Sequence, residues 1–336
     1  MRYRVTLIEG DGIGPEVTGA TCRVLEAAGA PVEWERVVAG QAAFAEYGHP
    51  LPERVIDSLK ANRIGLKGPL GTPKGGGFRS ANVQLRQRLQ LFTGWRPVRS
   101  LRGVASRYEN VDVVVLRENT EGLYAGIEHQ VRDDTVVSLK LSSAAAAERI
   151  ARWAFEYARN HGRRRITVCH KKAVLPKGDG AFVDAFHEVG RNYPFMGQDE
   201  ASLDEVAMGL AQDPSQYDVL LLENLYGDIL SDLCAGLVGG LGVVPGANVG
   251  HQVALFEAVH GTAPDIAGKG IANPLAVLLS GCLMVEWMGA HAVARRVREA
   301  IERVLEAGKV RTGDLGGSAS TQEFAEAIID AMEGRP

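Results

Sequence analysis

The stretch YRVTLIEGDGIGPEVTGATCRVLEAA, residues 3–28, decides the fold class. Tyr3–Ile8 has the alternating, β-prone pattern of a strand, and a glycine-rich loop follows it. Pro15 stands where the first turn of a helix tolerates proline, and apolar residues then recur on one helical face. We therefore expect a strand, a loop and a helix in succession, which is the building unit of α/β proteins.

Similar units follow along the chain. Further apolar strands are expected at 111–116, 166–169 and 219–222, with helix-period segments at 143–159 and 180–189 between them. This alternation predicts an α/β protein with a largely parallel sheet. Residues 127–142 have the pattern of a β-arm, and the part from Pro274 onward predicts mostly helices, the last opened by a capping box of Ser320 and Glu323.

Length and composition limit the class of protein. A chain of 336 residues suggests two domains, and 46% hydrophobic with 23% charged residues is typical of a globular protein. The net charge of -4 argues against a nucleic-acid partner. Apolar runs are too short for a membrane span, no signal peptide is evident and the four cysteines form no CxxC pair, so we expect a cytoplasmic protein without a membrane partner.

Charges are segregated along the chain. Residues 67–117 hold ten lysines and arginines and two acids, whereas residues 192–268 hold eleven acids and neither lysine nor arginine. Either the first stretch binds an anion and the second a cation, or the fold pairs the two stretches with each other. The motifs within each stretch favour the first interpretation. The forty glycines, spread over many short loops, are expected to approach bound ligands closely.

The basic stretch contains three arginines that could surround one ligand. Each guanidinium group of Arg86, Arg96 and Arg117 can donate two parallel hydrogen bonds to one carboxylate. Three such groups would suit a di- or tricarboxylate ligand. Ser80 and Asn82 precede Arg86 near the start of an expected helix, where an anion is favoured. The alternative is that these arginines lie on the solvent-exposed surface.

The acidic stretch contains two aspartates spaced for one helical face. Asp228 and Asp232 follow the expected strand 219–222, and oxygen ligands alone indicate Mg²⁺ or Mn²⁺ in preference to zinc. Asp204 could complete the set, and a solvated helix face is the alternative. Lys171, at the end of a strand, is a candidate base and Tyr124 a candidate proton donor, although either could be structural.

Two glycine-containing loops are candidates for a cofactor. Residues 256–273, FEAVHGTAPDIAGKGIAN, permit close contact with a flat ligand such as adenine, and an Asp there could accept from a ribose 2′-hydroxyl. Residues 9–16, EGDGIGPE, lack the GxGxxG spacing of a Rossmann fingerprint, so a tight turn is the alternative to an anion site.

Taken together, these runs resemble the β-decarboxylating dehydrogenases, the family of isocitrate, homoisocitrate and 3-isopropylmalate dehydrogenases. The resemblance is carried by GDGIGPE from residue 10, RENTEGLY from 117, NLYGDILSD from 224 and HGTAPDIAGKGIANP from 260. It implies a two-domain α/β fold that is not Rossmann, with residues 1–98 and 255–336 as the large, cofactor-binding domain and 99–254 as the small one. The arm near 127–142 would clasp the partner in a homodimer with shared active sites, with higher oligomers left open.

The resemblance also implies roles for single residues. Tyr124 and Lys171 would be catalytic, and Asp204, Asp228 and Asp232 would bind Mg²⁺ or Mn²⁺, with Lys171 and Asp204 donated by the partner subunit. Substrate would be bound by Lys67, Ser80, Asn82, Arg86, Arg96 and Arg117. The cofactor NAD would be bound by Ile13, Thr72, His260, Gly261, Thr262, Ala263, Asp265, Ile266 and Asn273.

Within this family the motifs favour one reaction. Ser80 with Asn82 matches the isocitrate enzymes, and Asp265 with Ile266 replaces the Lys and Tyr typical of NADP enzymes. The expected function is therefore NAD-dependent oxidative decarboxylation of isocitrate. The alternatives are homoisocitrate or 3-isopropylmalate as substrate, and a non-catalytic regulatory subunit. Lys172 and Ala173 depart from the family pattern of a small residue followed by Asn, and Glu223 stands where a neutral residue is common.

Overall fold

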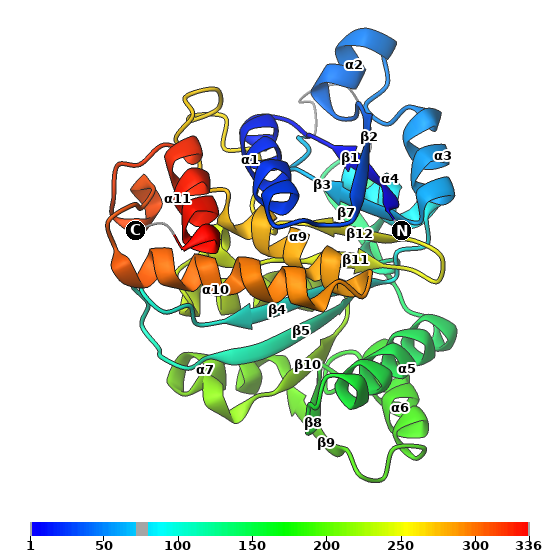
Figure 1. Cartoon of the computed structure of the whole chain (residues 1–336). Coiled ribbons are helices and arrows are strands. Elements are labelled where there is room, and N and C mark those ends of the chain that lie inside the picture. The colour runs from blue at the N-terminus through cyan, green and yellow to red at the C-terminus, as the bar shows by residue number, and fades with distance from the viewer. Residues whose placement is uncertain (1, 72–79, 335–336) are drawn as a thin grey trace.

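The computed structural model of the chain describes residues 2–71 and 80–334. In this part of the chain one long mixed sheet forms the centre, helices pack against its faces, and a separate hairpin projects from it (Figure 1). The strands of the central sheet are β1 (Tyr3–Ile8), β2 (Val32–Val37), β3 (Ile64–Lys67), β4 (Thr93–Arg99), β5 (Asp112–Glu118), β8 (Arg165–His170), β9 (Gly197–Ser202), β10 (Val219–Leu222), β11 (Ala247–Val249) and β12 (Ala254–Glu257).

The helices connect and cover these strands. They are α1 (Gly14–Ala27), α2 (Gln41–Tyr47), α3 (Glu53–Asn62), α4 (Ala81–Arg88), α5 (Ala144–Asn160), α6 (Gly178–Gly190), α7 (Leu203–Gln212), α8 (Asn224–Leu237), α9 (Leu275–Trp287), α10 (His291–Ala307) and α11 (Thr321–Glu333). Short 3₁₀ turns are η1 (Pro214–Gln216), η2 (Leu241–Val243) and η3 (Gly313–Leu315).

The strand order is β2-β1-β3-β12-β11-β4-β5-β10-β8-β9. Pairing is parallel from β2 to β12 and again from β5 to β9, but β11 is antiparallel to both neighbours and β4 is antiparallel to β5. The largely parallel α/β sheet predicted from the sequence is therefore confirmed. The expected domain boundaries at 98/99 and 254/255 fall inside β4 and β12 of this continuous sheet, and the division into domains stays a prediction.

Local sequence signals explain several elements. Pro15 lies in the first turn of α1, and the Ser143 hydroxyl caps α5 by accepting the Ala146 N–H at 3.2 Å. Ser320 and Glu323 form the expected capping box of α11. Helix α9 is apolar on every side because it lies between the sheet and other helices, and it is buried from Leu275 to Val285. None of the described helices is long and apolar enough to cross a lipid bilayer.

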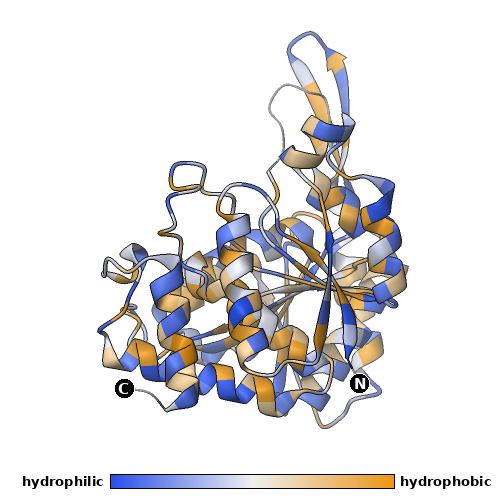
Figure 2. Cartoon of the chain, turned by 45° about the horizontal axis from the view of Figure 1, so that its top comes forward, coloured by the Kyte–Doolittle hydropathy of each residue, from blue (hydrophilic) through white to orange (hydrophobic). Residues whose placement is uncertain are grey.

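The predicted arm is present as an antiparallel hairpin outside the central sheet. It consists of β6 (Gly122–Arg132) and β7 (Thr135–Leu141), and it extends away from the rest of the molecule (Figure 2). Apolar side chains on the hairpin are open to solvent, with Val131 56% and Val136 57% exposed. An isolated two-stranded hairpin is only marginally stable in water, so this exposed apolar surface suits contact with another chain.

Candidate active site

Four side chains form a buried charged cluster beneath the carboxyl ends of β3 and β12. Lys67 ends β3, Arg96 lies on β4 and Arg86 on α4, and all three face the Glu257 carboxylate at the end of β12. Lys67 Nζ is 2.5 Å from Glu257 Oε2, and the Arg86 and Arg96 guanidinium groups are 3.9 and 4.0 Å from Oε1. One carboxylate thus faces three cations.

The charges within this cluster perturb one another. Burial acts to raise the pKa of Glu257, but the positive charges of Lys67, Arg86 and Arg96 outweigh it and lower the pKa to about 2. Burial lowers the pKa of Arg96 to about 10, and the Glu257 charge opposes this shift. Glu257 and Arg96 are therefore both charged at neutral pH, and the cluster keeps an excess of positive charge.

A second group surrounds Arg117 at the end of β5. Its Nε and Nη2 donate to Asn224 Oδ1 at 3.0 and 2.7 Å, and Nη1 donates to the Asp228 carboxylate on α8. The Tyr124 hydroxyl, from β6, donates to the same carboxylate, and the Arg117 guanidinium lies 4.9 Å from the Tyr124 ring centre. Gly227 permits this approach of α8, because a Cβ there would be 2.6 Å from the Arg117 side chain.

The acid groups of this cluster have shifted pKa values. Burial, followed by the hydrogen bond to Asp228 and its charge, raises the pKa of Tyr124, so the phenol keeps its proton at neutral pH. Partial desolvation and then the Asp228 charge raise the pKa of Asp232, one helical turn further along α8. As the spacing predicts, the two aspartates interact along one face of the helix.

Lys171 and Asp204 form a third group. Lys171 follows β8, Asp204 lies in the first turn of α7, and their side chains form an ion pair. Among the described residues, no hydrogen bond or ion pair connects this pair to Tyr124, Asp228 or Asp232. Nor do three or more His, Cys, Asp or Glu side chains of the described residues gather as a metal site. A single chain therefore does not assemble the predicted metal set.

The remaining predicted substrate residues lie at the start of α4. Ser80 is the residue before the helix, and Asn82 lies in its first turn, on the same helix as Arg86. The Asn82 amide donates to Leu70 O at 3.5 Å, while its Oδ1 is buried without a hydrogen-bond partner among the described residues. A buried amide oxygen without a hydrogen-bond partner lowers the stability of the fold. A bound ligand that donates a hydrogen bond to this oxygen would remove that cost. Thr72, assigned to the cofactor, lies outside the described residues.

Four predicted cofactor residues line one cavity of about 450 Å³. Ile13, His260, Ile266 and Asn273 border it, together with Asp314, which accepts the Asn273 amide at 2.9 Å. Burial lowers the pKa of His260, and its Nε2 is buried without a hydrogen-bond partner among the described residues. A neutral imidazole with an unused ring nitrogen in a largely apolar cavity suits a flat heteroaromatic ligand.

The other predicted cofactor residues do not border this cavity. Gly261, Thr262 and Ala263 lie in the loop beside it, and Asp265 is exposed. Thr262 O accepts the Ile13 N–H at 3.0 Å, so this loop positions the cavity wall through its backbone. Asp314, the first residue of the run DLGG, was not among the predicted site residues.

The glycine-rich loop after β1 serves contacts within the protein. A Cβ on Gly10 would lie 2.4 Å from Pro69 O, and a Cβ on Gly12 would lie 2.0 Å from Thr262 O. The Asp11 carboxylate accepts the N–H groups of Gln41 and Gly71, each at 2.8 Å. These glycines let loops of the chain approach one another, and their approach to a bound ligand stays a prediction.

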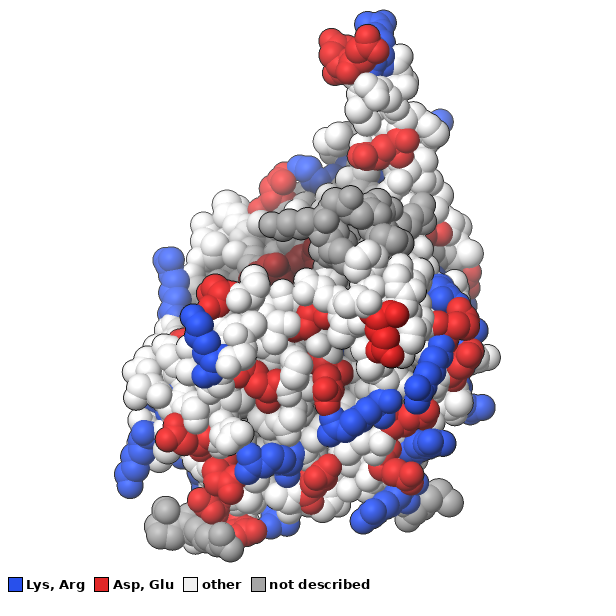
Figure 3. All heavy atoms as spheres, turned by 90° about the horizontal axis from the view of Figure 1, so that it is seen from above, with Lys and Arg blue, Asp and Glu red and all other residues white. Residues whose placement is uncertain are grey.

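The segregated charges are in contact with each other in this structure, as the alternative interpretation expected, and the binding of an anion by one stretch and a cation by the other stays a prediction. Arg117 of the basic stretch pairs with Asp228 of the acidic one, and Lys67, Arg86 and Arg96 meet Glu257. Sequence reasoning missed Glu257, whose signal was a single acid ending the apolar run ALFE. On the face seen in Figure 3, basic and acidic side chains are interspersed, as on an ordinary solvated surface.

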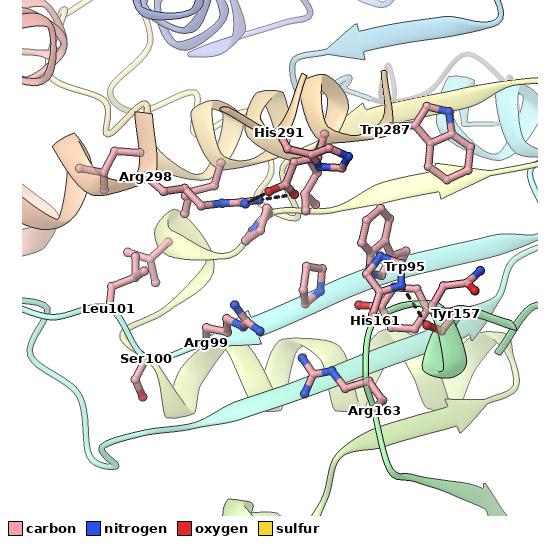
Figure 4. A pocket seen from close by; sticks show the side chains of 18 of the residues that line it. Trp95, Arg99, Ser100, Leu101, Tyr157, His161, Arg163, Trp287, His291 and Arg298 are labelled. Atoms are coloured by element: carbon pink, nitrogen blue, oxygen red, sulfur yellow. Dashed lines mark hydrogen bonds and ion pairs between the residues drawn. The ribbon is translucent and has the colours of Figure 1, made fainter. Parts of the chain in front are cut away.

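Another cavity, of about 600 Å³, lies on the other side of β4. Because side chains alternate along a strand, Arg96 points to the charged cluster while Trp95 and Pro97 border this cavity. Trp95, Tyr157 and His161 lie together on one wall, and Trp287 belongs to another (Figure 4). It holds none of the predicted site residues, so the candidate active site is the charged face of the sheet.

A mixed α/β sheet with buried cations beside a phenol and two aspartates agrees with what the resemblance to the β-decarboxylating dehydrogenases implies. A family model described as isocitrate/isopropylmalate dehydrogenase matches residues 4–328, and the chain belongs to this family. A solved structure described as isocitrate dehydrogenase from Methylococcus capsulatus superimposes with a TM-score of 0.95 at 46% identity, covering 98% of this chain and 99% of that one. The predicted fold is thereby confirmed.

Named relatives are similar over nearly the whole chain. A Drosophila melanogaster protein, named as the probable alpha subunit of mitochondrial NAD isocitrate dehydrogenase, is 47% identical over 97% of this chain and 86% of its own length. A Dictyostelium discoideum protein, named as a regulatory subunit of mitochondrial NAD isocitrate dehydrogenase, is also 47% identical, over 97% of this chain and 91% of its own length.

These names bear on two further predictions. The relatives from Drosophila melanogaster, Caenorhabditis elegans and Arabidopsis thaliana are all named mitochondrial, which contradicts the prediction of a cytoplasmic location. The names also describe subunits, one of them regulatory, and so give no support to the predicted homodimer.

Proposed function

We propose that this chain catalyses the NAD-dependent oxidative decarboxylation of isocitrate to 2-oxoglutarate and CO₂ with Mg²⁺ or Mn²⁺. The observation that carries the proposal is the buried cluster of Lys67, Arg86, Arg96 and Arg117 beside Tyr124 and the aspartates of α8. Four cations face the two carboxylates of Glu257 and Asp228. The remaining positive charge in a desolvated site suits a substrate with several carboxylates.

The acidic residues of α8 fit a hard divalent cation. Asp228 and Asp232 offer only oxygen ligands on one helix face, and the pKa of Asp232 is raised by partial desolvation and then by the charge of Asp228, which a bound cation would offset. Asp204 of a second chain would complete the set, because Asp204 of the same chain lies with Lys171 in another group. When bound, the metal ion supplies Lewis acidity that stabilises negative charge on substrate oxygens.

The remaining chemistry is assigned to side chains of the protein. Arg86, Arg96 and Arg117 would hold the substrate carboxylates. Lys171, as the neutral amine after giving up a proton to solvent, would accept the proton of the substrate hydroxyl as hydride leaves the same carbon for NAD. Loss of CO₂ leaves its bonding electrons on the neighbouring carbon. Tyr124, which keeps its proton at neutral pH, then protonates that carbon.

The cofactor is assigned to the cavity bordered by Ile13, His260, Ile266 and Asn273. Asp265 lies beside this cavity on an exposed turn, where a carboxylate would repel the 2′-phosphate of NADP. NAD is therefore the proposed oxidant. The names of the similar proteins, which specify NAD, support this assignment.

The chain is proposed to be a catalytic subunit. Similar proteins include one named catalytic and one named regulatory, at equal identity, so similarity does not separate the roles. The retained Tyr124, Lys171, Asp204, Asp228 and Asp232 support catalysis. Because one chain does not bring these groups together among its described residues, a second chain, identical or different, is proposed to complete each site.

The decisive experiment is to purify the chain alone and follow NADH formation with isocitrate, homoisocitrate and 3-isopropylmalate in Mg²⁺. We expect turnover with isocitrate well above the other two and loss of activity with EDTA. Preference for another substrate would move the assignment within the family. Binding of isocitrate without turnover, by calorimetry, would favour the regulatory role, and undiminished activity of Asp228→Asn at low Mg²⁺ would contradict the metal assignment.

A further inference from the structure

The turn after β8, which carries Lys171, is held by the histidine before it. His170 Nδ1 accepts the backbone N–H of Lys172 at 3.1 Å. In the neutral ring the hydrogen is therefore on Nε2, which lies 3.0 Å from Glu200 Oε1 on β9 and donates to it. The imidazole thus connects the turn to the neighbouring strand with a defined tautomer.

Glu200 contacts three side chains from two segments of the chain. Besides His170, it forms an ion pair with the Lys172 ammonium, and its Oε2 lies 3.2 Å from Nε2 of His187 on α6. Burial acts to raise the pKa of Glu200, but Lys172 and the two histidines outweigh it and lower the pKa. The carboxylate is therefore ionised at neutral pH and holds residues 170 and 172 at once.

Lys171 lies between these two anchored neighbours. Its backbone N–H donates to Asp179 Oδ2 at 2.6 Å, and Asp179 is fully buried. Its ammonium pairs with Asp204. The Lys172 side chain, in contrast, pairs with Glu200 and not with Asp204. This departure from the family pattern therefore adds a second contact between Glu200 and the turn that carries Lys171.

We propose that Glu200 is a positioning residue for Lys171: by binding His170 and Lys172, it fixes the backbone from which the catalytic lysine extends. The inference rests on the proposed function. Misplacing a catalytic group by about 1 Å can lower the rate about a hundredfold. Contacts that fix the backbone on both sides of Lys171 are therefore expected to affect kcat.

The first test compares substitutions of Glu200. Glu200→Ala removes every contact and is expected to lower kcat about tenfold or more, with KM for isocitrate and NAD changed less than about twofold. Glu200→Gln keeps an oxygen that accepts from His170, so most of kcat is expected to return. Glu188→Ala is the matched control, because Glu188 pairs with exposed Arg191 at 2.5 Å on the surface of the protein, and its loss is expected to leave kcat unchanged.

A double-substitution cycle separates positioning from a general structural role. If Glu200 acts through Lys171, Glu200→Ala has no further effect on kcat in a Lys171→Ala background. Equal losses in both backgrounds, or a Glu200→Ala protein with wild-type kcat, would overturn the proposal.

Hydrogen exchange tests the positioning without turnover. In Glu200→Ala, the amide of Lys171 is expected to exchange faster than in wild type, while Glu188→Ala leaves it protected. If wild type fails to oxidise isocitrate, the proposed function fails, yet this exchange result still decides whether Glu200 holds the turn. Unchanged exchange at Lys171 would refute the proposal whatever the activity.

Discussion

At the scale of single residues, the feature that organises the site is a carboxylate that the motifs did not reveal. Glu257 sits among Lys67, Arg86 and Arg96 in a buried cluster. Without it, three cations would face one another away from water, which is costly. The free protein therefore uses an internal anion to keep the cations proposed to bind substrate in place.

Glu257→Gln is expected to lower the free energy of unfolding at pH 7 by about 3 kcal/mol, because it leaves Lys67 buried without its ion partner. The pKa of Glu257 is lowered from 4.5 to about 2, so its contribution is complete above pH 4.5 and is lost as the pH falls toward 2. Urea unfolding should show that the difference in free energy of unfolding between wild type and variant is smaller at pH 3 than at pH 7. An equal difference at both pH values would contradict this account.

At the scale of elements, two loops that are distant in sequence form the cavity proposed for the cofactor by contacting each other through their backbones. The loop after β1 reaches residues 260–263, where Ile13 N–H meets Thr262 O at 3.0 Å. Gly12, with φ of 60°, makes this approach possible. The position of the cavity wall thus depends on Gly12, although Gly12 has no side chain and does not itself border the cavity.

Gly12→Ala is expected to raise the Kd for NAD about tenfold, since the new Cβ would lie 2.0 Å from Thr262 O and displace the loop that carries His260. Calorimetric titration with NAD measures this. Gly19→Ala is the control: Gly19 lies within α1, a Cβ there meets no atom within 4 Å, and the affinity should stay as in wild type. If both variants bound NAD with the same Kd, the proposed role of Gly12 in shaping the cofactor cavity would be wrong.

At the scale of the whole molecule, the site is divided. Tyr124 and Asp228 lie with Arg117, whereas Lys171 and Asp204 form their own pair, and the apolar hairpin of β6 and β7 projects into solvent. A protein whose proposed catalytic groups lie in separate places and whose apolar arm is exposed is expected to function as an assembly.

Mixing two variants of low activity tests this division, provided that the chain forms dimers with itself. Tyr124→Phe and Lys171→Ala chains are each expected to lose most of their activity and to keep a small, measurable kcat. If every site takes Tyr124 from one chain and Lys171 from the other, unfolding and refolding an equal mixture restores about a quarter of wild-type activity. No recovery, despite mixed dimers seen by native mass spectrometry, would place both residues in the same chain's site.

What the sequence determined by itself was local. The strands Tyr3–Ile8 and Val219–Leu222 begin and end where alternation and apolar runs predicted, and Ser320 caps α11 as expected. These features follow from side-chain periodicity and capping chemistry, which involve only neighbours along the chain. The family motifs likewise pointed to Arg96, Arg117 and Asp228 as site residues, and this assignment stays a prediction.

Only the tertiary structure decided which charges meet. Glu257 enters the cation cluster because β12 pairs with β3, and Arg117 meets Asp228 because β5 pairs with β10, the strand that leads into α8. The separation of Lys171 from Tyr124, and the contacts of Glu200 behind that lysine, depend equally on β8 and β9 lying at one edge of the sheet. Such contacts join residues that are far apart in sequence. The periodicity of side chains within one segment does not say which strands lie next to each other in the sheet.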